Sequence, residues 1–203
     1  MFHQIMGIER ALPWLMTALA AGYLFGSIPF GVLVARVFKL GDLRKIGSGN
    51  IGATNVLRTG NKVAAGITLL LDALKGTIPV LLFLQWGDLA GQLAGLGAFL
   101  GHCFPVWLRF HGGKGVATWL GVMLGIHPLT WAAVCLTWLA AAVVTRISSA
   151  GALLAAASGP VWLIIFGRWE AVLLAIILGA MVWLRHHANI RRILHGEEPR
   201  IGK

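Results

Sequence analysis

Two apolar runs follow one another in residues 63–103, which read VAAGITLLLDALKGTIPVLLFLQWGDLAGQLAGLGAFLGHC. Only a short polar step at Gly87 and Asp88 separates them. About 20 consecutive apolar residues are enough for a helix to cross the hydrocarbon core of a bilayer. Glycine recurs in both runs, which is typical of membrane helices whose backbones approach closely. The stretch therefore predicts two consecutive transmembrane helices.

The composition extends this prediction to the whole chain of 203 residues. Hydrophobic residues make up 58% of it and charged residues only 12%, whereas soluble proteins carry about 25% charged residues. We therefore expect one all-α integral membrane domain over residues 1–203, with no room for a separate soluble domain. The net charge of +10 then points to anionic lipids and anionic substrates rather than to nucleic acid.

Hydropathy divides the chain into seven predicted spans. The fourth is too short for a hydrocarbon core of about 30 Å unless the loop before it enters the membrane. The seven spans are Leu12–Phe38, Val63–Trp86, Leu89–Cys103, Val116–Ile126, Leu129–Thr145, Ala150–Gly167 and Ala171–Leu184.

The distribution of Lys and Arg predicts the orientation of these spans. Positive loops remain cytoplasmic, so we expect the N-terminus outside and the C-terminus inside. Three polar, glycine-rich segments then share the cytoplasmic side, where they form either one composite site or merely connecting loops whose charge sets the topology. Of the 17 Lys and Arg residues, all but Arg10, Lys75 and Arg168 fall on that side, namely Arg36, Lys39, Arg44, Lys45, Arg58, Lys62, Arg109, Lys114, Arg146, Arg185, Arg191, Arg192, Arg200 and Lys203.

The first polar segment, residues 47–58, is rich in glycine and in small polar side chains. Backbone N–H groups in such a segment can form a concave nest for an anion, and Arg58 can add a bidentate clamp. No Gly-Lys-Ser/Thr ends the segment, so it is not a P-loop. The candidate ligands are Ser48, Gly49, Asn50, Thr54, Asn55 and Arg58.

The second polar segment places Lys114 among Gly112, Gly113 and Gly115. Glycines allow a loop to close around a phosphate while the ammonium group neutralises it. A helix that begins near Gly115 would add free N–H groups and the positive end of its dipole. This segment is also the loop that precedes the short fourth span.

The third polar segment holds His186 and Asn189, which lie three residues apart and so share one side of a helix. Arg191 and Arg192 fit the ordinary basic tail that follows a membrane helix. Ser148 and Ser149 follow the positive residue at the end of the fifth span, where they are either phosphate donors or a helix-capping turn.

Inside the second span, Asp72 and Lys75 lie three residues apart near the middle of the membrane. Unpaired charges are costly there, so we expect the two side chains to face the bundle interior and to pair. The other carboxylates are scattered, and none of them forms a metal cage. No nucleophile and base are paired in the sequence either, which suggests a transferase whose donor arrives already activated.

The order and spacing of these segments resemble the signature motifs of the bacterial acyl-phosphate-dependent glycerol-3-phosphate acyltransferases, integral enzymes of the inner membrane. The resemblance covers essentially the whole chain. Around Arg146 that family reads Arg-Tyr-x-Ser, and Ile147 replaces the aromatic residue here. The other matching residues are Gly47–Asn55 with Arg58, Asp72 with Lys75 and Gly76, Gly101 and His102 with Phe104 and Pro105, Gly112–Thr118, and His186, Asn189 and Ile190 with Arg192, Gly196 and Glu197.

The resemblance implies transfer of a fatty acyl group from acyl phosphate to the 1-hydroxyl of glycerol 3-phosphate, with lysophosphatidate and inorganic phosphate as products. We expect no cofactor and no metal, and membrane lipid as a partner beside the two substrates. The sequence leaves open whether the protein docks with the enzyme that makes acyl phosphate. The alternative function is a small transporter of a phosphorylated solute. However, the polar segments lie on one face, and no internal repeat of the kind common in transporters is evident.

The resemblance also implies roles for individual residues. The expected catalytic residues are Ser48, Arg58, Lys114, His186 and Asn189. The expected substrate-binding residues are Gly49, Asn50, Thr54, Asn55, Gly112, Gly113 and Ser149, while Asp72 and Lys75 are expected to be structural.

Overall fold

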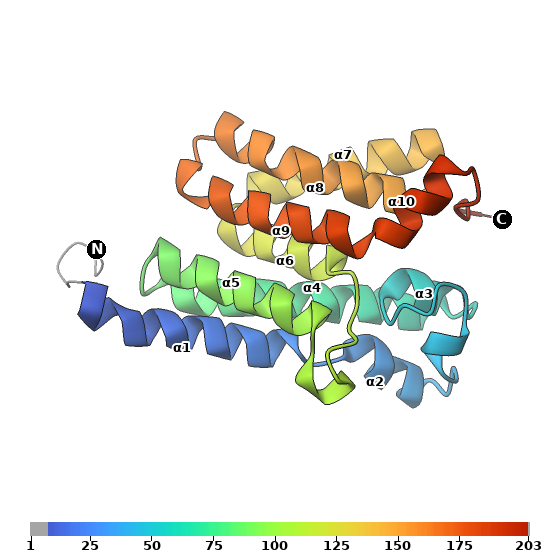
Figure 1. Cartoon of the computed structure of the whole chain (residues 1–203), viewed down its shortest axis with the longest axis horizontal. Coiled ribbons are helices and arrows are strands. Elements are labelled where there is room, and N and C mark those ends of the chain that lie inside the picture. Colours follow the sequence, from blue (N-terminus) through green and yellow to red (C-terminus); the bar gives the residue numbers. More distant parts are fainter. Residues whose placement is uncertain (1–7, 203) are drawn as a thin grey trace. The chain divides into compact units, whose positions relative to one another are not determined.

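The computed structural model describes residues 8–202, and every regular element in that range is a helix (Figure 1). The expected all-α class is therefore confirmed for the described residues. The chain, predicted as one membrane domain, divides into two compact units: a first unit that ends at Ile126 and a second unit that begins at His127. Lys203, counted above among the positive residues, lies outside the described range.

The first unit contains six α-helices and two short 3₁₀ helices among its described residues. These are α1 (Ile8–Gly26), α2 (Phe30–Val37), η2 (Leu43–Lys45), α3 (Ala53–Leu57), α4 (Lys62–Leu84), α5 (Asp88–Cys103), η3 (Val106–Leu108) and α6 (Val116–Ile126). The second unit contains α7 (Pro128–Thr145), α8 (Ser148–Ile165), η4 (Trp169–Ala171), α9 (Val172–Arg185) and α10 (His187–Leu194).

Several of these helices are suited to a membrane. Within residues 8–202, five segments are long and apolar enough to cross one, and a sixth is obtained if the pair Trp169–Arg185 and His187–Leu194, bent by 61°, counts as one span. Helix α6 has the predicted bounds, but its 11 residues extend only about 16 Å. The seven-span count therefore stays a prediction. The five segments are Glu9–Val37, Lys62–Leu84, Asp88–Leu108, Pro128–Thr145 and Ser148–Ile165.

The first predicted span is interrupted in the structure. Helix α1 ends at Gly26 and α2 begins at Phe30, so Ser27, Ile28 and Pro29 lie between them. Proline lacks an N–H group and disfavours helical geometry in the residue before it. The carbonyl of Ile28 accepts a hydrogen bond from the Lys75 ammonium of α4 at 2.8 Å, so a buried charge supports the break.

Glycine and alanine determine how closely the helices of the first unit pack. Gly22 and Gly26 of α1 lie against the backbone of α5 at Ala94 and Ala98. A Cβ atom on Gly97 of α5 would in turn overlap the α1 backbone. Such small residues let membrane helices make backbone-to-backbone contact. The same kind of contact joins α4 to α6, because Gly76 lies against Thr118 and Gly121 against Ala73.

In the second unit, α8 packs against both α7 and α9. Two indole N–H groups link these helices: Trp162 donates to the Thr137 hydroxyl at 3.2 Å, and Trp183 donates to the Leu153 carbonyl at 3.1 Å. After α10 the chain returns to the end of α7, where the Ile201 N–H donates to the Arg146 carbonyl at 2.7 Å. The residues after α10 are thus part of this unit's fold.

We expect Gly97→Ala to lower the melting temperature of the detergent-purified protein. Its new methyl group would meet the Tyr23 nitrogen at 2.8 Å and the Leu19 carbonyl carbon at 3.1 Å, and overpacking of this kind costs about 1–3 kcal/mol. Gly66→Ala is the matched control, because Gly66 is also helical but has open space around its Cβ position. It should melt at or above the wild-type temperature, since alanine favours a helix. Equal melting of the two variants would contradict this account of the α1–α5 contact.

Candidate active site

The first polar segment is organised around a buried asparagine. Asn55, at 1% exposure, donates its side-chain N–H to the Leu43 carbonyl at 2.8 Å, and its side-chain oxygen accepts from the Ser48 N–H at 3.2 Å. Its position was predicted as a substrate ligand, and the structure shows it holding the segment's own backbone. The exposed hydroxyl of Ser48 lies 3.5 Å from the same oxygen.

Arg58 lies over the start of this segment. A Cβ atom built on Gly47 would stand 2.7 Å from the Arg58 side chain and 2.7 Å from the Asn55 oxygen. Gly47 and Gly49 both have positive φ, at 51° and 69°, a conformation that glycine adopts without steric cost. The structure therefore brings Ser48, Asn55 and Arg58 together.

Two other predicted ligands of this segment, Asn50 and Thr54, lie just before α3 and in its first turn. The Asn50 side-chain nitrogen is 3.3 Å from the Cβ position of Gly52, at the start of α3. Thr54, in α3 itself, is exposed. Among the described residues, neither side chain forms a hydrogen bond or ion pair with Arg58.

The second polar segment is fixed to the end of α5. The N–H of Gly112 donates to the Cys103 carbonyl and that of Gly113 to the His102 carbonyl, each at 3.1 Å. These two N–H groups thus hold the loop in place. A Cβ on either glycine would overlap His102, on its carbonyl or on its ring, so both positions require close approach. Lys114 follows directly, and α6 begins two residues later.

The 3₁₀ helix η2, which comes just before the first polar segment, lies beside the second polar segment. The Arg44 guanidinium, in η2, donates to the carbonyl of His111 at 3.0 Å. This contact spans 67 residues of sequence and joins the two loops of the first unit at one end of its helices.

The predicted pair of charged residues, Asp72 and Lys75, is formed in α4. The Lys75 ammonium lies 2.7 Å from Oδ1 of Asp72, and both residues are 2% exposed. The structure adds His102, whose Nδ1 is 3.6 Å from the same carboxylate oxygen. Sequence reasoning placed this histidine in a motif but gave it no role, because nothing in a linear reading brings α4 and the end of α5 together.

In the second unit, His186 and Asn189 are buried at the junction of α9 and α10. The His186 Nδ1 faces the Val182 carbonyl at 2.7 Å. Since a carbonyl can only accept, Nδ1 bears the proton and Nε2 has the lone pair when the ring is neutral. This tautomer leaves Nε2 as the basic atom.

A single carboxylate organises the rest of this cluster. Glu198 accepts from the Ser149 hydroxyl at 2.7 Å and from the Asn189 amide at 2.5 Å. Its second oxygen accepts from the Arg192 Nε at 2.6 Å. Ser149 is buried and takes part in the cluster, which favours it over Ser148 as the serine of this segment.

Glu198 is the residue that sequence reasoning missed. Burial alone would raise the pKa of this carboxyl group, but hydrogen bonds from Ser149, Asn189 and Arg192 outweigh burial and hold the pKa below its ordinary value. The signal for Glu198 in the sequence was that Glu197 and Glu198 are two adjacent acids in an otherwise basic tail. The resemblance pointed to its exposed neighbour Glu197 instead.

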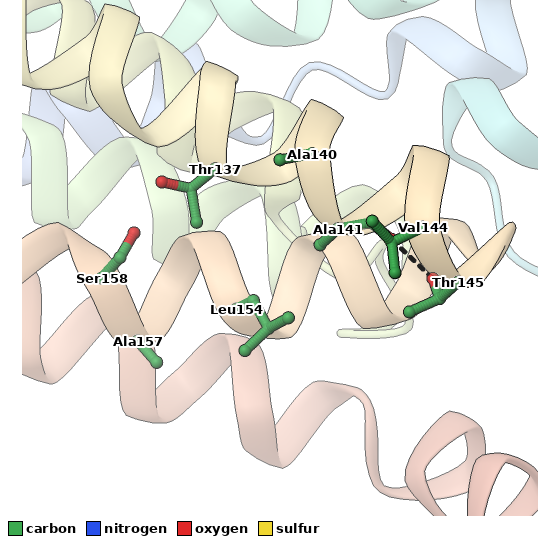
Figure 2. A pocket seen from close by; sticks show the side chains of 8 residues that line it. All are labelled: Thr137, Ala140, Ala141, Val144, Thr145, Leu154, Ala157 and Ser158. Carbon is green, nitrogen blue, oxygen red and sulfur yellow. Dashed lines mark hydrogen bonds between the residues drawn. The ribbon is translucent and has the colours of Figure 1, made fainter.

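A groove runs between α7 and α8. Its volume is about 700 Å³, and Figure 2 shows the lining residues projecting from the two helices. The hydroxyls of Thr145 and Ser158 donate to carbonyls of their own helices, at 2.7 and 2.9 Å, which leaves an apolar surface. The lining residues are Thr137, Ala140, Ala141, Val144, Thr145, Leu154, Ala157 and Ser158.

We expect Glu198→Gln to lower the melting temperature at pH 7, because the amide would turn an N–H toward groups that also donate. The folded pKa of Glu198 is lowered, so its stabilisation is present above the ordinary value of 4.5 and is lost as the pH falls through the folded value. The difference between wild type and variant should therefore shrink below about pH 4.5. Thermal melts at several pH values measure it.

Glu197→Gln is the control for that experiment, since Glu197 is adjacent and exposed. It should melt like the wild type throughout the pH range. A Glu198→Gln variant that also melts like the wild type at pH 7 would show that the three hydrogen bonds add no stability.

Comparison with known proteins gives one consistent result. A family model described as glycerol-3-phosphate acyltransferase matches residues 16–196. The chain is 56% identical over 197 residues to the glycerol-3-phosphate acyltransferase of Cereibacter sphaeroides, covering 97% of this chain and 94% of that protein. It is 57% identical over 195 residues to the protein of the same description from Sinorhizobium fredii, covering 96% of each.

A solved structure supports the same assignment. The chain is similar to PlsY (YgiH), an integral membrane glycerol 3-phosphate acyltransferase solved in its glycerol 3-phosphate form, with a TM-score of 0.88 and 38% identity over 93% of this chain and 96% of that one. The lysophosphatidic acid form of PlsY gives a TM-score of 0.85. Together with the apolar helices, these likenesses show that this multi-pass membrane protein belongs to the glycerol-3-phosphate acyltransferase family.

Proposed function

We propose that the protein transfers a fatty acyl group from acyl phosphate to the 1-hydroxyl of glycerol 3-phosphate. The products are 1-acylglycerol 3-phosphate and inorganic phosphate, and the reaction serves phospholipid biosynthesis. The observation that carries this proposal is the likeness, over nearly the whole chain, to an acyltransferase solved in its glycerol 3-phosphate form. Two substrates that each bear a phosphate also account for glycine-rich loops with Arg58 and Lys114.

In the proposed reaction, the glycerol hydroxyl oxygen attacks the acyl carbonyl carbon directly. A C–O ester bond forms and the C–O bond of the acyl-phosphate anhydride breaks. The departing phosphate takes the hydroxyl proton, so no covalent enzyme intermediate is required. The chain's contribution is then to bind and orient the two phosphates.

The proposed ligands fall into two sets. Ser48, Asn50 and Ser149 hold the phosphate of the acyl donor, while Gly49, Thr54 and Asn55 shape the first loop. Gly112 and Gly113, whose own N–H groups are bonded to the end of α5, let the second loop close around that phosphate. Arg58, Lys114, His186 and Asn189 hold and orient glycerol 3-phosphate. Ser149 and Asn189 each donate to Glu198, so one carboxylate holds two of the proposed ligands in place.

His186 is the second proton acceptor to consider. Its Nδ1 donates to a backbone carbonyl, which leaves Nε2 as the basic atom. If His186 accepts the proton, His186→Gln removes one pKa from the pH–rate profile. An unchanged profile assigns the proton to the departing phosphate.

We propose seven spans in the inner membrane, with the polar loops on the cytoplasmic side. The bounds of α6 and the bent pair of α9 and α10 support this count. We place the acyl tail in the α7–α8 groove, because the groove is apolar and open. An enzyme that makes acyl phosphate is the expected partner.

The proposed function is tested on purified protein with palmitoyl phosphate and glycerol 3-phosphate in the absence of added metal. Phosphate release together with lysophosphatidate supports it. Phosphate release alone would indicate hydrolysis and a mistaken acceptor. Solute exchange across vesicles without a new acyl ester would indicate the alternative function, transport of a phosphorylated solute.

We expect Lys114→Ala to lower turnover about 100-fold or more, because it removes a cation placed to bind phosphate in the transition state. Phosphate release assays measure this. Lys62→Ala is the control, since Lys62 is exposed at the first turn of α4, and it should retain normal turnover. Equal turnover of the two variants would remove Lys114 from the site.

We expect Ala157→Phe to shift the preference of the enzyme toward shorter acyl phosphates, because the ring would fill part of the groove. The measurement is the ratio of kcat/KM for palmitoyl phosphate to that for lauroyl phosphate. Val161→Phe is the control, because Val161 is an exposed residue of α8 that does not line the groove. A ratio unaffected by Ala157→Phe would place the tail elsewhere.

A further inference from the structure

Three ionisable side chains are buried together next to the second polar segment. Asp72 and Lys75 come from α4, and His102 comes from the last turn of α5. Their exposures are 2%, 2% and 4%. Oδ1 of Asp72 faces both neighbours, with the Lys75 ammonium at 2.7 Å and Nδ1 of His102 at 3.6 Å.

Charge neutralisation explains two members of this group and leaves the third unexplained. A carboxylate and an ammonium group inside a membrane protein compensate each other's charge. Lys75 has a further task, since it donates to the Ile28 carbonyl at the break between α1 and α2 at 2.8 Å. Neither the charge neutralisation nor the hydrogen bond to Ile28 requires a histidine beside the Asp72 carboxylate.

His102 contacts the loop through both its backbone and its ring. Its carbonyl accepts from the Gly113 N–H at 3.1 Å. Its ring lies so close to Gly113 that a Cβ there would overlap Nε2 and would stand 2.9 Å from Cε1. The orientation of the imidazole therefore determines how near the loop lies to α5, and Lys114 is the next residue of that loop.

We propose that Asp72 and His102 are positioning residues that set the distance between the Gly112–Gly115 loop and the end of α5, and with it the position of the Lys114 ammonium group. The Asp72 carboxylate orients the His102 imidazole through Nδ1. The opposite edge of the ring supports Gly113. Lys75 holds the carboxylate and links it to the α1–α2 break.

This inference rests on the proposed acyltransferase function, so wild-type turnover is measured first. The informative variant is Asp72→Asn with Lys75→Met, because it removes both charges of the pair at once. Replacing a buried ion pair as a whole is far less disruptive than removing one partner. If the pair only neutralises itself, this double variant should bind its substrates normally.

We expect the double variant to raise the KM for at least one phosphate-bearing substrate about 10-fold, because a small displacement of the loop weakens its contact with the substrate phosphate. The kcat should fall as well, but by much less than in Lys114→Ala, since the cation is displaced and not removed. His102→Asn leaves the Asp72–Lys75 pair intact and should give a shift of similar size. The shifts should not add when His102→Asn is combined with the double variant, since both act through one ring. Asp88→Asn, at the exposed start of α5, is the control and should behave as wild type.

The outcomes distinguish failure of the proposed acyltransferase function from failure of the positioning role. A wild-type protein that makes no acyl ester contradicts the proposed function. An active wild type together with normal KM values in the double variant, or in His102→Asn, overturns the positioning role while leaving the function intact. Additive KM shifts when His102→Asn is combined with the double variant would also overturn it.

Discussion

Backbone contact between α1 and α5 is the constraint on which the first unit depends. Glycines on both helices allow it, and a methyl group at Gly26 or Gly97 would overlap the opposite backbone. Dispersion contacts of this kind hold membrane helices together where the hydrophobic effect cannot. The contact fixes the last turn of α5, and the carbonyls of His102 and Cys103 at that turn then hold the second polar loop. Helix packing thus determines where a functional loop lies.

Each unit uses one buried polar side chain to organise a polar region. In the first unit, Asn55 joins the Leu43 carbonyl to the Ser48 N–H. In the second, Glu198 accepts from three donors, one at the start of α8 and two in α10. A buried acceptor with several donors is stable only when all of them are in place. These residues therefore give precise geometry to segments that have little apolar surface of their own.

Much of the fold could be predicted from the sequence because hydropathy and length are local properties. The predicted Val116–Ile126 segment agrees with α6 at both ends, and the predicted Asp72–Lys75 pair is formed because only a partner makes a charge tolerable at that depth. The interruption at Pro29 was missed, since the apolar run continues through it and hydropathy does not register a lost N–H group.

The site was harder to predict because its contacts are distant in sequence. Nothing in the motif around Gly113 shows that its N–H is bound to the His102 carbonyl. Whether the three polar segments form one composite site likewise stays a prediction. Glu198 was missed for the same reason, because its partner Ser149 lies 49 residues earlier.

That separation has a consequence for the order of folding. The Ser149–Glu198 bond closes a segment that contains most of α8 and all of α9 and α10, and contacts of long sequence separation form slowly because closing the intervening chain costs entropy. Asn189 and Arg192 lie close to Glu198 in sequence, so only the Ser149 bond depends on the arrangement of all three helices. A chain whose α9 has not inserted would leave Ser149 without the carboxylate, and the second unit would be incomplete before any substrate arrives.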